Sequence, residues 1–181
     1  MNLPNLITLG RLLCVPVAIW LVLSDDLRAA FWLFVAAGLS DAIDGFIAKR
    51  FDQRSRLGAL LDPLADKALL VSMFVTLGVA GHLATWLVIL VVFRDVLIIG
   101  GFLLITALAQ TMRWEPLFIS KLNTALQIAL IAVVLGQLGL GIPVFGLGRI
   151  LTYAVAATTV ISGISYLVRW GSALAGVEED K

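Results

Sequence analysis

The sequence is poor in charged residues and in cysteine, and both shortages narrow what the protein can be. Charged side chains make up only 14% of its 181 residues, whereas hydrophobic ones make up 61%. A soluble globular domain is roughly half apolar and a quarter charged. The single cysteine, Cys14, excludes a disulfide within the chain and a cysteine-based metal site. No basic run points to nucleic acid, and the net charge of +1 points to no charged partner.

Long apolar stretches fill most of the chain, whose mean hydropathy is +1.04. A helix needs about 20 residues to cross a bilayer, so a chain of this length accommodates about six spans. The pattern predicts an all-α membrane protein: a six-transmembrane-helix bundle with a short N-terminal amphipathic segment, forming one domain over residues 1–181. Residues 1–11 lack a cationic start and a small-residue cleavage site, so we expect no cleaved signal peptide.

Basic residues gather in alternate loops between the predicted spans. The spans are expected at residues 12–23, 29–49, 58–79, 84–108, 117–135 and 150–170, after an amphipathic lead-in over residues 2–11. One side of the membrane receives Lys49, Arg50, Arg54, Arg56, Arg113, Lys121 and Arg169, and the other side only Arg28 and Arg149. Cytoplasmic loops carry the excess of basic residues. We therefore expect an integral membrane protein with both termini in the cytoplasm.

Four aspartates lie within the second and third predicted spans. Asp41 and Asp44 are three residues apart, and Asp62 and Asp66 are four apart, so each pair shares one helical face. At about 1.5 Å per residue, both pairs lie at a similar depth from the short loop that joins their helices. Carboxylates in a membrane segment are costly and usually functional. The arrangement predicts a shared site at the cytoplasmic leaflet.

A hard divalent cation would relieve the repulsion among these acids. Mg²⁺ binds to carboxylates and substrate phosphates, and two such ions can clamp a phosphoryl group during displacement. The lack of a cysteine or histidine cluster disfavours zinc or copper. A purely structural pairing is the alternative, but only Lys49 and Lys67 lie near enough in sequence to neutralise four acids.

Small and cationic residues accompany the aspartates. Gly45, Ala48 and Gly58 remove bulk beside the carboxylates, which allows a ligand or a neighbouring helix to approach closely. Lys49 and Arg50 lie where a diphosphate would need positive charge. Helix packing alone would also account for the small residues.

The segment from Asp41 to Asp66, DAIDGFIAKRFDQRSRLGALLDPLAD, resembles the CDP-alcohol phosphatidyltransferase family. That family shares the pattern D-x-x-D-G-x-x-A-R-x8-G-x-x-x-D-x-x-x-D, and seven of its fixed positions are matched here in register. Lys49 departs from the family's arginine, which puts bidentate phosphate contact at that position in doubt. The opening NLPNLITLGRLL is similar to the start of bacterial glycerophospholipid members, and this resemblance implies a location in a bacterial inner membrane.

The resemblance implies an enzyme that moves a phosphatidyl group from CDP-diacylglycerol to an alcohol and releases CMP. It implies a homodimer with two Mg²⁺ or Mn²⁺ ions at the cytoplasmic leaflet. The implied metal ligands are Asp41, Asp44, Asp62 and Asp66, with Asp66 also the candidate general base. The implied CDP-binding residues are Gly45, Ala48, Lys49 and Gly58.

The acceptor alcohol depends on the later part of the chain. Arg94 and Lys121 are candidates for binding the acceptor's phosphate, although Arg94 and Asp95 also fit a local structural ion pair. The segment ISKLNTA at residues 119–125 is similar to cardiolipin-forming members, and few cations surround the expected pocket. We therefore expect phosphatidylglycerol as the acceptor, with glycerol 3-phosphate as the alternative. A small cation-coupled transporter is a remote alternative. The acids of a transport path would be spread across the bilayer, whereas the four aspartates here cluster at one leaflet.

Overall fold

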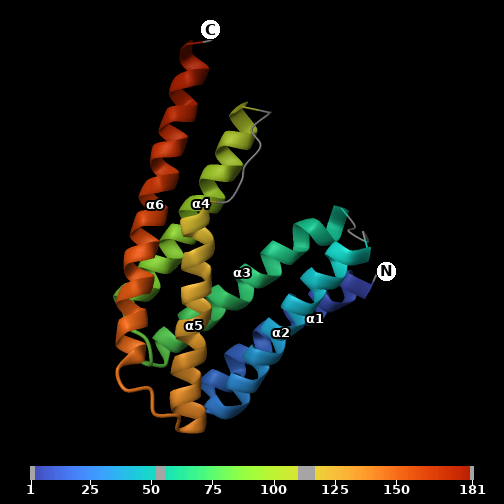
Figure 1. Ribbon diagram of the computed structural model, residues 1–181, viewed down its shortest axis with the longest axis vertical. Coiled ribbons are helices and arrows are strands. Elements are labelled where there is room, and N and C mark those ends of the chain that lie inside the picture. The colour runs from blue at the N-terminus through green and yellow to red at the C-terminus, as the bar shows by residue number, and fades with distance from the viewer. Residues whose placement is uncertain (1–2, 52–55, 110–116, 180–181) are drawn as a thin grey trace. The chain divides into compact units, whose positions relative to one another are not determined.

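The structure is a computed structural model, and every regular secondary-structure element that it describes is a helix (Figure 1). It describes the backbone of residues 3–51, 56–109 and 117–179 and the side chains of residues 10–40, 67–101 and 117–171. The helices are α1 (Leu3–Leu23), α2 (Leu27–Phe51), α3 (Arg56–Val79), α4 (Thr85–Ala109), α5 (Phe118–Leu140) and α6 (Leu147–Glu179). The all-α prediction is confirmed. The expected lead-in is not a separate element, since α1 is one helix from Leu3 onward.

Helix ends follow from local chemistry. The Asp26 carboxylate accepts a hydrogen bond from the Ala29 amide at 3.1 Å, which caps the start of α2. Gly81 and Gly141 have φ of 78° and 69°, the left-handed conformation that ends α3 and α5. Pro16 lies within α1, near enough to its middle to remove one backbone hydrogen bond.

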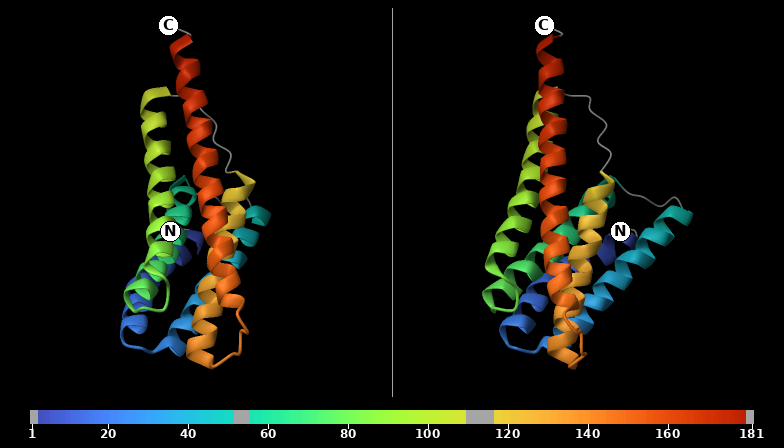
Figure 2. Two further views of the ribbon diagram at one scale, coloured as in Figure 1. Left: turned by 90° about the vertical axis from the view of Figure 1, so that its left-hand side faces the viewer. Right: turned by 60° about the vertical axis from the view of Figure 1, so that its left-hand side comes forward.

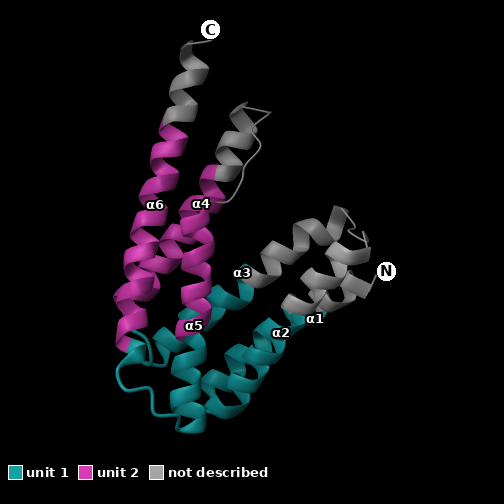
Figure 3. Cartoon of the chain, in the orientation of Figure 1, with its two compact units in different colours: residues 1–84, 131–148 teal, residues 85–130, 149–181 magenta. Residues whose placement is uncertain are grey.

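Contacts divide the chain into two compact units, and α5 contributes to both (Figure 3). The first unit contains residues 1–84 and 131–148, and in it α1 packs against α2 and α3. Its fully buried core includes Met73, Phe74 and Leu77 of α3. The end of α5 approaches the start of α2 so closely that a Cβ on Gly139 would lie 2.5 Å from the Leu27 carbonyl oxygen. A glycine is therefore required there.

The second unit contains residues 85–130 and 149–181, which comprise α4, the first half of α5 and most of α6 (Figures 2 and 3). Leu87, Val91, Leu130 and Val155 form its fully buried apolar part. Farther along α4 and α6, Trp170 packs against Tyr166, with ring centroids 5.9 Å apart, and Leu97, Ile98 and Leu117 surround the pair. This unit contains all the polar contacts described below.

Two helical stretches with described side chains are long and apolar enough to cross a membrane, Phe118–Leu140 and Leu147–Gly171. Only 28% and 22% of their apolar windows are buried, so most of each surface faces outward. The core helix of a soluble protein would be mostly buried. These two helices fit a membrane protein, while the expectation of six spans is not confirmed by them.

Candidate active site

The predicted metal site falls where the structure gives helix bounds alone. The range of α2 includes Asp41 and Asp44, and that of α3 includes Asp62 and Asp66. Their side chains lie outside the described residues, as do those of Gly45, Ala48, Lys49 and Gly58. Across the side chains that are described, no three potential metal ligands come together. The metal-binding and CDP-binding residues therefore remain predictions.

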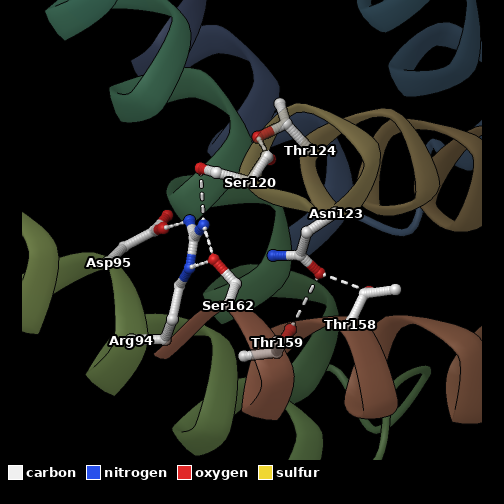
Figure 4. A network of polar contacts seen from close by, with 8 residues as sticks. All are labelled: Arg94, Asp95, Ser120, Asn123, Thr124, Thr158, Thr159 and Ser162. Carbon is white, nitrogen blue, oxygen red and sulfur yellow. Dashed lines mark hydrogen bonds and ion pairs between the residues drawn. The ribbon is translucent and has the colours of Figure 1, made fainter. Parts of the chain in front are cut away.

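Arg94 is the charged centre of the second unit (Figure 4). It lies on α4 and is only 3% exposed, as is Asp95, the next residue. Its Nη1 donates to Asp95 Oδ1 at 2.8 Å, so the two charges form a buried ion pair. Such a pair is costly to remove from water and needs further hydrogen bonds to be stable.

Two serines supply those further hydrogen bonds. Arg94 Nη2 donates to Ser120 Oγ of α5 at 2.6 Å, and Nε donates to Ser162 Oγ of α6 at 3.2 Å. Nη2 also donates to Ser162 Oγ. The guanidinium therefore joins α4, α5 and α6 at one level, and we call Arg94, Asp95, Ser120 and Ser162 the serine–arginine cluster.

One turn farther along α5, Asn123 forms a second polar contact with α6 (Figure 4). Its side-chain oxygen accepts hydrogen bonds from Thr158 at 2.8 Å and from Thr159 at 3.0 Å. Residue numbers increase along α5 from Ser120 to Asn123, while those of the matching residues on α6 decrease from Ser162 to Thr159. The two helices are therefore antiparallel here. Asn123 is fully buried, and its Nδ2 has no hydrogen-bond partner within the described part of the chain.

Gln127 continues the same face of α5, one turn beyond Asn123. It is fully buried, and neither its Oε1 nor its Nε2 has a partner among the described residues. The helix register brings Val155, an apolar and fully buried residue, to the level of Gln127. A buried amide left without partners costs about 1–3 kcal/mol.

Lys121 is exposed and adjacent to Ser120 at the start of α5. The two predicted acceptor-site cations therefore lie at the same end of α5, one buried beneath Ser120 and the other on the surface. The structure brings Arg94 and Ser120 into direct contact and adds Asp95 as a partial counter-charge. It does not bring the Lys121 ammonium into a described ion pair.

Six buried or partly buried polar residues of α5 and α6 were not among the candidate residues predicted from the sequence. They are Ser120, Asn123, Gln127, Thr158, Thr159 and Ser162. A signal for them was present, because polar residues recur every three or four positions on one face of two otherwise apolar helices. Such spacing in a membrane helix indicates contact with a neighbouring helix.

Comparisons with a family model and with individual proteins point to the same family. A family model described as CDP-alcohol phosphatidyltransferase matches residues 1–162. A rice protein (Oryza sativa subsp. japonica) named chloroplastic CDP-diacylglycerol–glycerol-3-phosphate 3-phosphatidyltransferase 1 is 34% identical over 94% of this chain and 57% of its own. Proteins of Rattus norvegicus and Homo sapiens named cardiolipin synthase (CMP-forming) are 36% identical over 91% of this chain and 60% of their own. The chain thus spans about three fifths of the length of these relatives.

Proposed function

The chain belongs to the CDP-alcohol phosphatidyltransferase family, and from that premise we propose that it transfers a phosphatidyl group from CDP-diacylglycerol to an alcohol with release of CMP. The observation that carries the proposal is the run of seven matched positions from Asp41 to Asp66, which falls within the region that the family model covers. The relatives' names support the same reaction class.

In the proposed reaction the acceptor hydroxyl attacks the phosphorus that carries diacylglycerol. The new bond joins the acceptor oxygen to that phosphorus, and the bond between the phosphorus and the CMP oxygen breaks. Asp66 takes the proton from the attacking hydroxyl, a role worth about 10²–10⁴-fold in rate. Gly45, Ala48, Lys49 and Gly58 line the CDP moiety, and Lys49 faces its diphosphate as a point charge.

A divalent metal is part of this proposal, and members of the family generally depend on one. Asp41, Asp44, Asp62 and Asp66 would hold two Mg²⁺ or Mn²⁺ ions, because these cations prefer carboxylate oxygens. Ions held there would neutralise charge on the diphosphate. Without them, four acids on two adjoining helices would repel one another.

The wider arrangement follows from the same proposal. Six helices cross the membrane, both termini are cytoplasmic, and the carboxylates face the cytoplasmic leaflet. Residues 1–181 act as one membrane domain that forms a homodimer. The outward-facing apolar surfaces of α5 and α6 support insertion in a bilayer.

Phosphatidylglycerol is the acceptor that we propose, with cardiolipin as the product. The buried contact of Arg94 with Asp95 offsets part of the positive charge at the candidate acceptor site. A phosphodiester such as phosphatidylglycerol carries one negative charge, whereas glycerol 3-phosphate is a dianion that favours more cations. The relatives named cardiolipin synthase support this acceptor, and the rice relative keeps glycerol 3-phosphate as the second candidate.

Purified protein offered CDP-diacylglycerol tests the reaction class. CMP release that depends on an alcohol and on Mg²⁺ or Mn²⁺ is the expected result. The proposal would be contradicted if no CMP were released with any of the four acceptors phosphatidylglycerol, glycerol 3-phosphate, inositol phosphate and serine.

A further inference from the structure

The hydrogen bonds of Arg94 leave it little capacity to hold a ligand by itself. A guanidinium has five N–H groups. Nε donates to Ser162, Nη2 donates to Ser120 and Ser162, and Nη1 donates once to Asp95. Bidentate contact with a phosphate needs two parallel N–H groups. Only one N–H group, on Nη1, lacks an acceptor among the described residues, so Arg94 cannot present a fork in this arrangement.

The hydroxyls of Ser120 and Ser162 still have hydrogens to donate, unlike most N–H groups of Arg94. Each accepts a hydrogen bond from Arg94, and a hydroxyl that accepts can still donate its own hydrogen. No described residue accepts a hydrogen bond from either serine. By contrast, the hydroxyls of Thr124 and Ser165 donate to the backbone carbonyl oxygens of Ser120 and Ile161, at 3.1 and 2.7 Å. The hydroxyl hydrogens of Ser120 and Ser162 are thus available to a ligand, whereas those of Thr124 and Ser165 are already donated to the backbone.

Exposure distinguishes the two serines. Ser162 is fully buried, whereas Ser120 is half-buried in the first turn of α5, next to the exposed Lys121. A ligand that approaches the cluster from the surface therefore reaches Ser120 first. The buried Arg94 contacts that hydroxyl, with its Nη2 2.6 Å from Ser120 Oγ (Figure 4).

We infer that the Ser120 hydroxyl is the direct ligand of the acceptor's phosphate and that Arg94 acts through it. Arg94 draws electron density from the Ser120 oxygen and so strengthens its hydrogen as a donor, as in any chain of hydrogen bonds. Ser162 and Asp95 are positioning residues that hold the guanidinium in place. This inference rests on the proposed function and deepens it by naming the residue that meets the acceptor.

The same arrangement defines the class of acceptor that the site suits. One polarised hydroxyl and the Lys121 ammonium offer a single strong donor and a single mobile charge. That is enough for a phosphodiester with one negative charge, in which two of the four phosphorus-bound oxygens are esterified. A phosphomonoester dianion would leave more of its charge without a partner.

The test compares substitutions at two hydroxyls of α5 that differ in their hydrogen bonds. Ser120→Ala removes the proposed ligand, Ser120→Thr keeps a hydroxyl there, and Thr124→Ala removes a hydroxyl that is already bonded to the backbone. CMP release is measured against acceptor and against CDP-diacylglycerol in separate titrations. Because a hydrogen bond to an ionised group is among the stronger ones, Ser120→Ala is expected to raise the acceptor KM about tenfold or more.

The expected pattern has three further parts. The KM for CDP-diacylglycerol stays close to that of the wild type in Ser120→Ala, Ser120→Thr recovers most of the acceptor affinity, and Thr124→Ala resembles the wild type. An acceptor KM unchanged by Ser120→Ala, or both KM values raised together, would overturn the inference alone. If the wild-type protein released no CMP with any of the acceptors, the proposed function would be overturned, and this inference with it.

Discussion

Arg94 and Ser162 are 68 residues apart in the chain, yet Arg94 Nε donates a hydrogen bond to Ser162 Oγ at 3.2 Å. This contact fixes α4 against α6, and the neighbouring bond to Ser120 adds α5. Because the three helices are mostly apolar, a charge at their meeting point must be stabilised by several hydrogen-bonding groups at once. The serine–arginine cluster is thus a buried packing element, and its half-buried member, Ser120, is the residue that we propose meets the acceptor.

Removal of one partner of the buried ion pair is expected to be destabilising. Arg94→Ala removes the guanidinium that Asp95 contacts at 2.8 Å in the buried pair, and breaking such a pair costs about 3–5 kcal/mol. The free energy of unfolding in mixed detergent measures the loss. The double variant Arg94→Ala/Asp95→Ala should recover part of it, since both charges of the pair are then removed. A double variant no more stable than Arg94→Ala would contradict the assigned pairing.

Two buried amides one turn apart on α5 should respond differently to the same substitution. Asn123→Leu leaves the Thr158 and Thr159 hydroxyls without their shared acceptor, which is expected to cost about 1–2 kcal/mol. Gln127→Leu removes an amide without described partners, so its effect should be near zero or stabilising. The comparison uses unfolding in detergent. An equal loss at both positions would mean that Gln127 binds a water molecule or a ligand.

Adjacent glycines of α4 provide a matched pair for packing. A Cβ on Gly101 would collide with the indole ring of Trp170, whereas one on Gly100 would meet nothing within 4 Å. Gly101→Ala should therefore cost about 1–3 kcal/mol through overpacking. Gly100→Ala should stabilise the helix by up to about 1 kcal/mol. Thermal unfolding of the two variants compares them, and similar melting temperatures would contradict the close packing of Trp170 on α4.

The helices could largely be predicted from sequence, because length and hydropathy decide them. The expected spans at residues 84–108 and 58–79 agree with α4 and α3 to within two residues at each end. The last two helices run farther than predicted, α5 to Leu140 and α6 to Glu179. Gly136 and Gly139 lie beyond the expected end of the fifth span at residue 135. They are tolerated inside α5, where close contact with α2 stabilises the helix.

Part of the site could be predicted as well, and the rest depends on tertiary contacts. The Arg94–Asp95 pair was visible in the sequence and is found in the structure, whereas the metal site expected from the spacing of the aspartates stays a prediction. The other partners of Arg94 were not visible in the sequence, because Ser120 and Ser162 come from two other helices. Serine and threonine in apolar spans are common, and only the antiparallel register of α5 and α6 makes these into one cluster.

Asp66 provides a test of the proposed chemistry that is independent of the acceptor site. Asp66→Asn keeps the size of the side chain but removes a charge and the basic lone pair. Turnover should fall by at least about 10²-fold, the lower end of the range for general base catalysis. Chelation by EDTA should also abolish CMP release, and added Mg²⁺ or Mn²⁺ should restore it. More than half of wild-type turnover in the variant would exclude the role, and full activity in EDTA would exclude the metals.

The acceptor comparison tests the central claim most directly. Purified protein receives CDP-diacylglycerol and Mg²⁺ with either phosphatidylglycerol or glycerol 3-phosphate, and both CMP and the lipid product are measured. Phosphatidylglycerol should yield CMP and cardiolipin in equal amounts, while glycerol 3-phosphate should yield little of either product. Turnover with glycerol 3-phosphate and none with phosphatidylglycerol would contradict the proposed acceptor. If neither acceptor led to CMP release, the proposed cardiolipin synthesis itself would be contradicted.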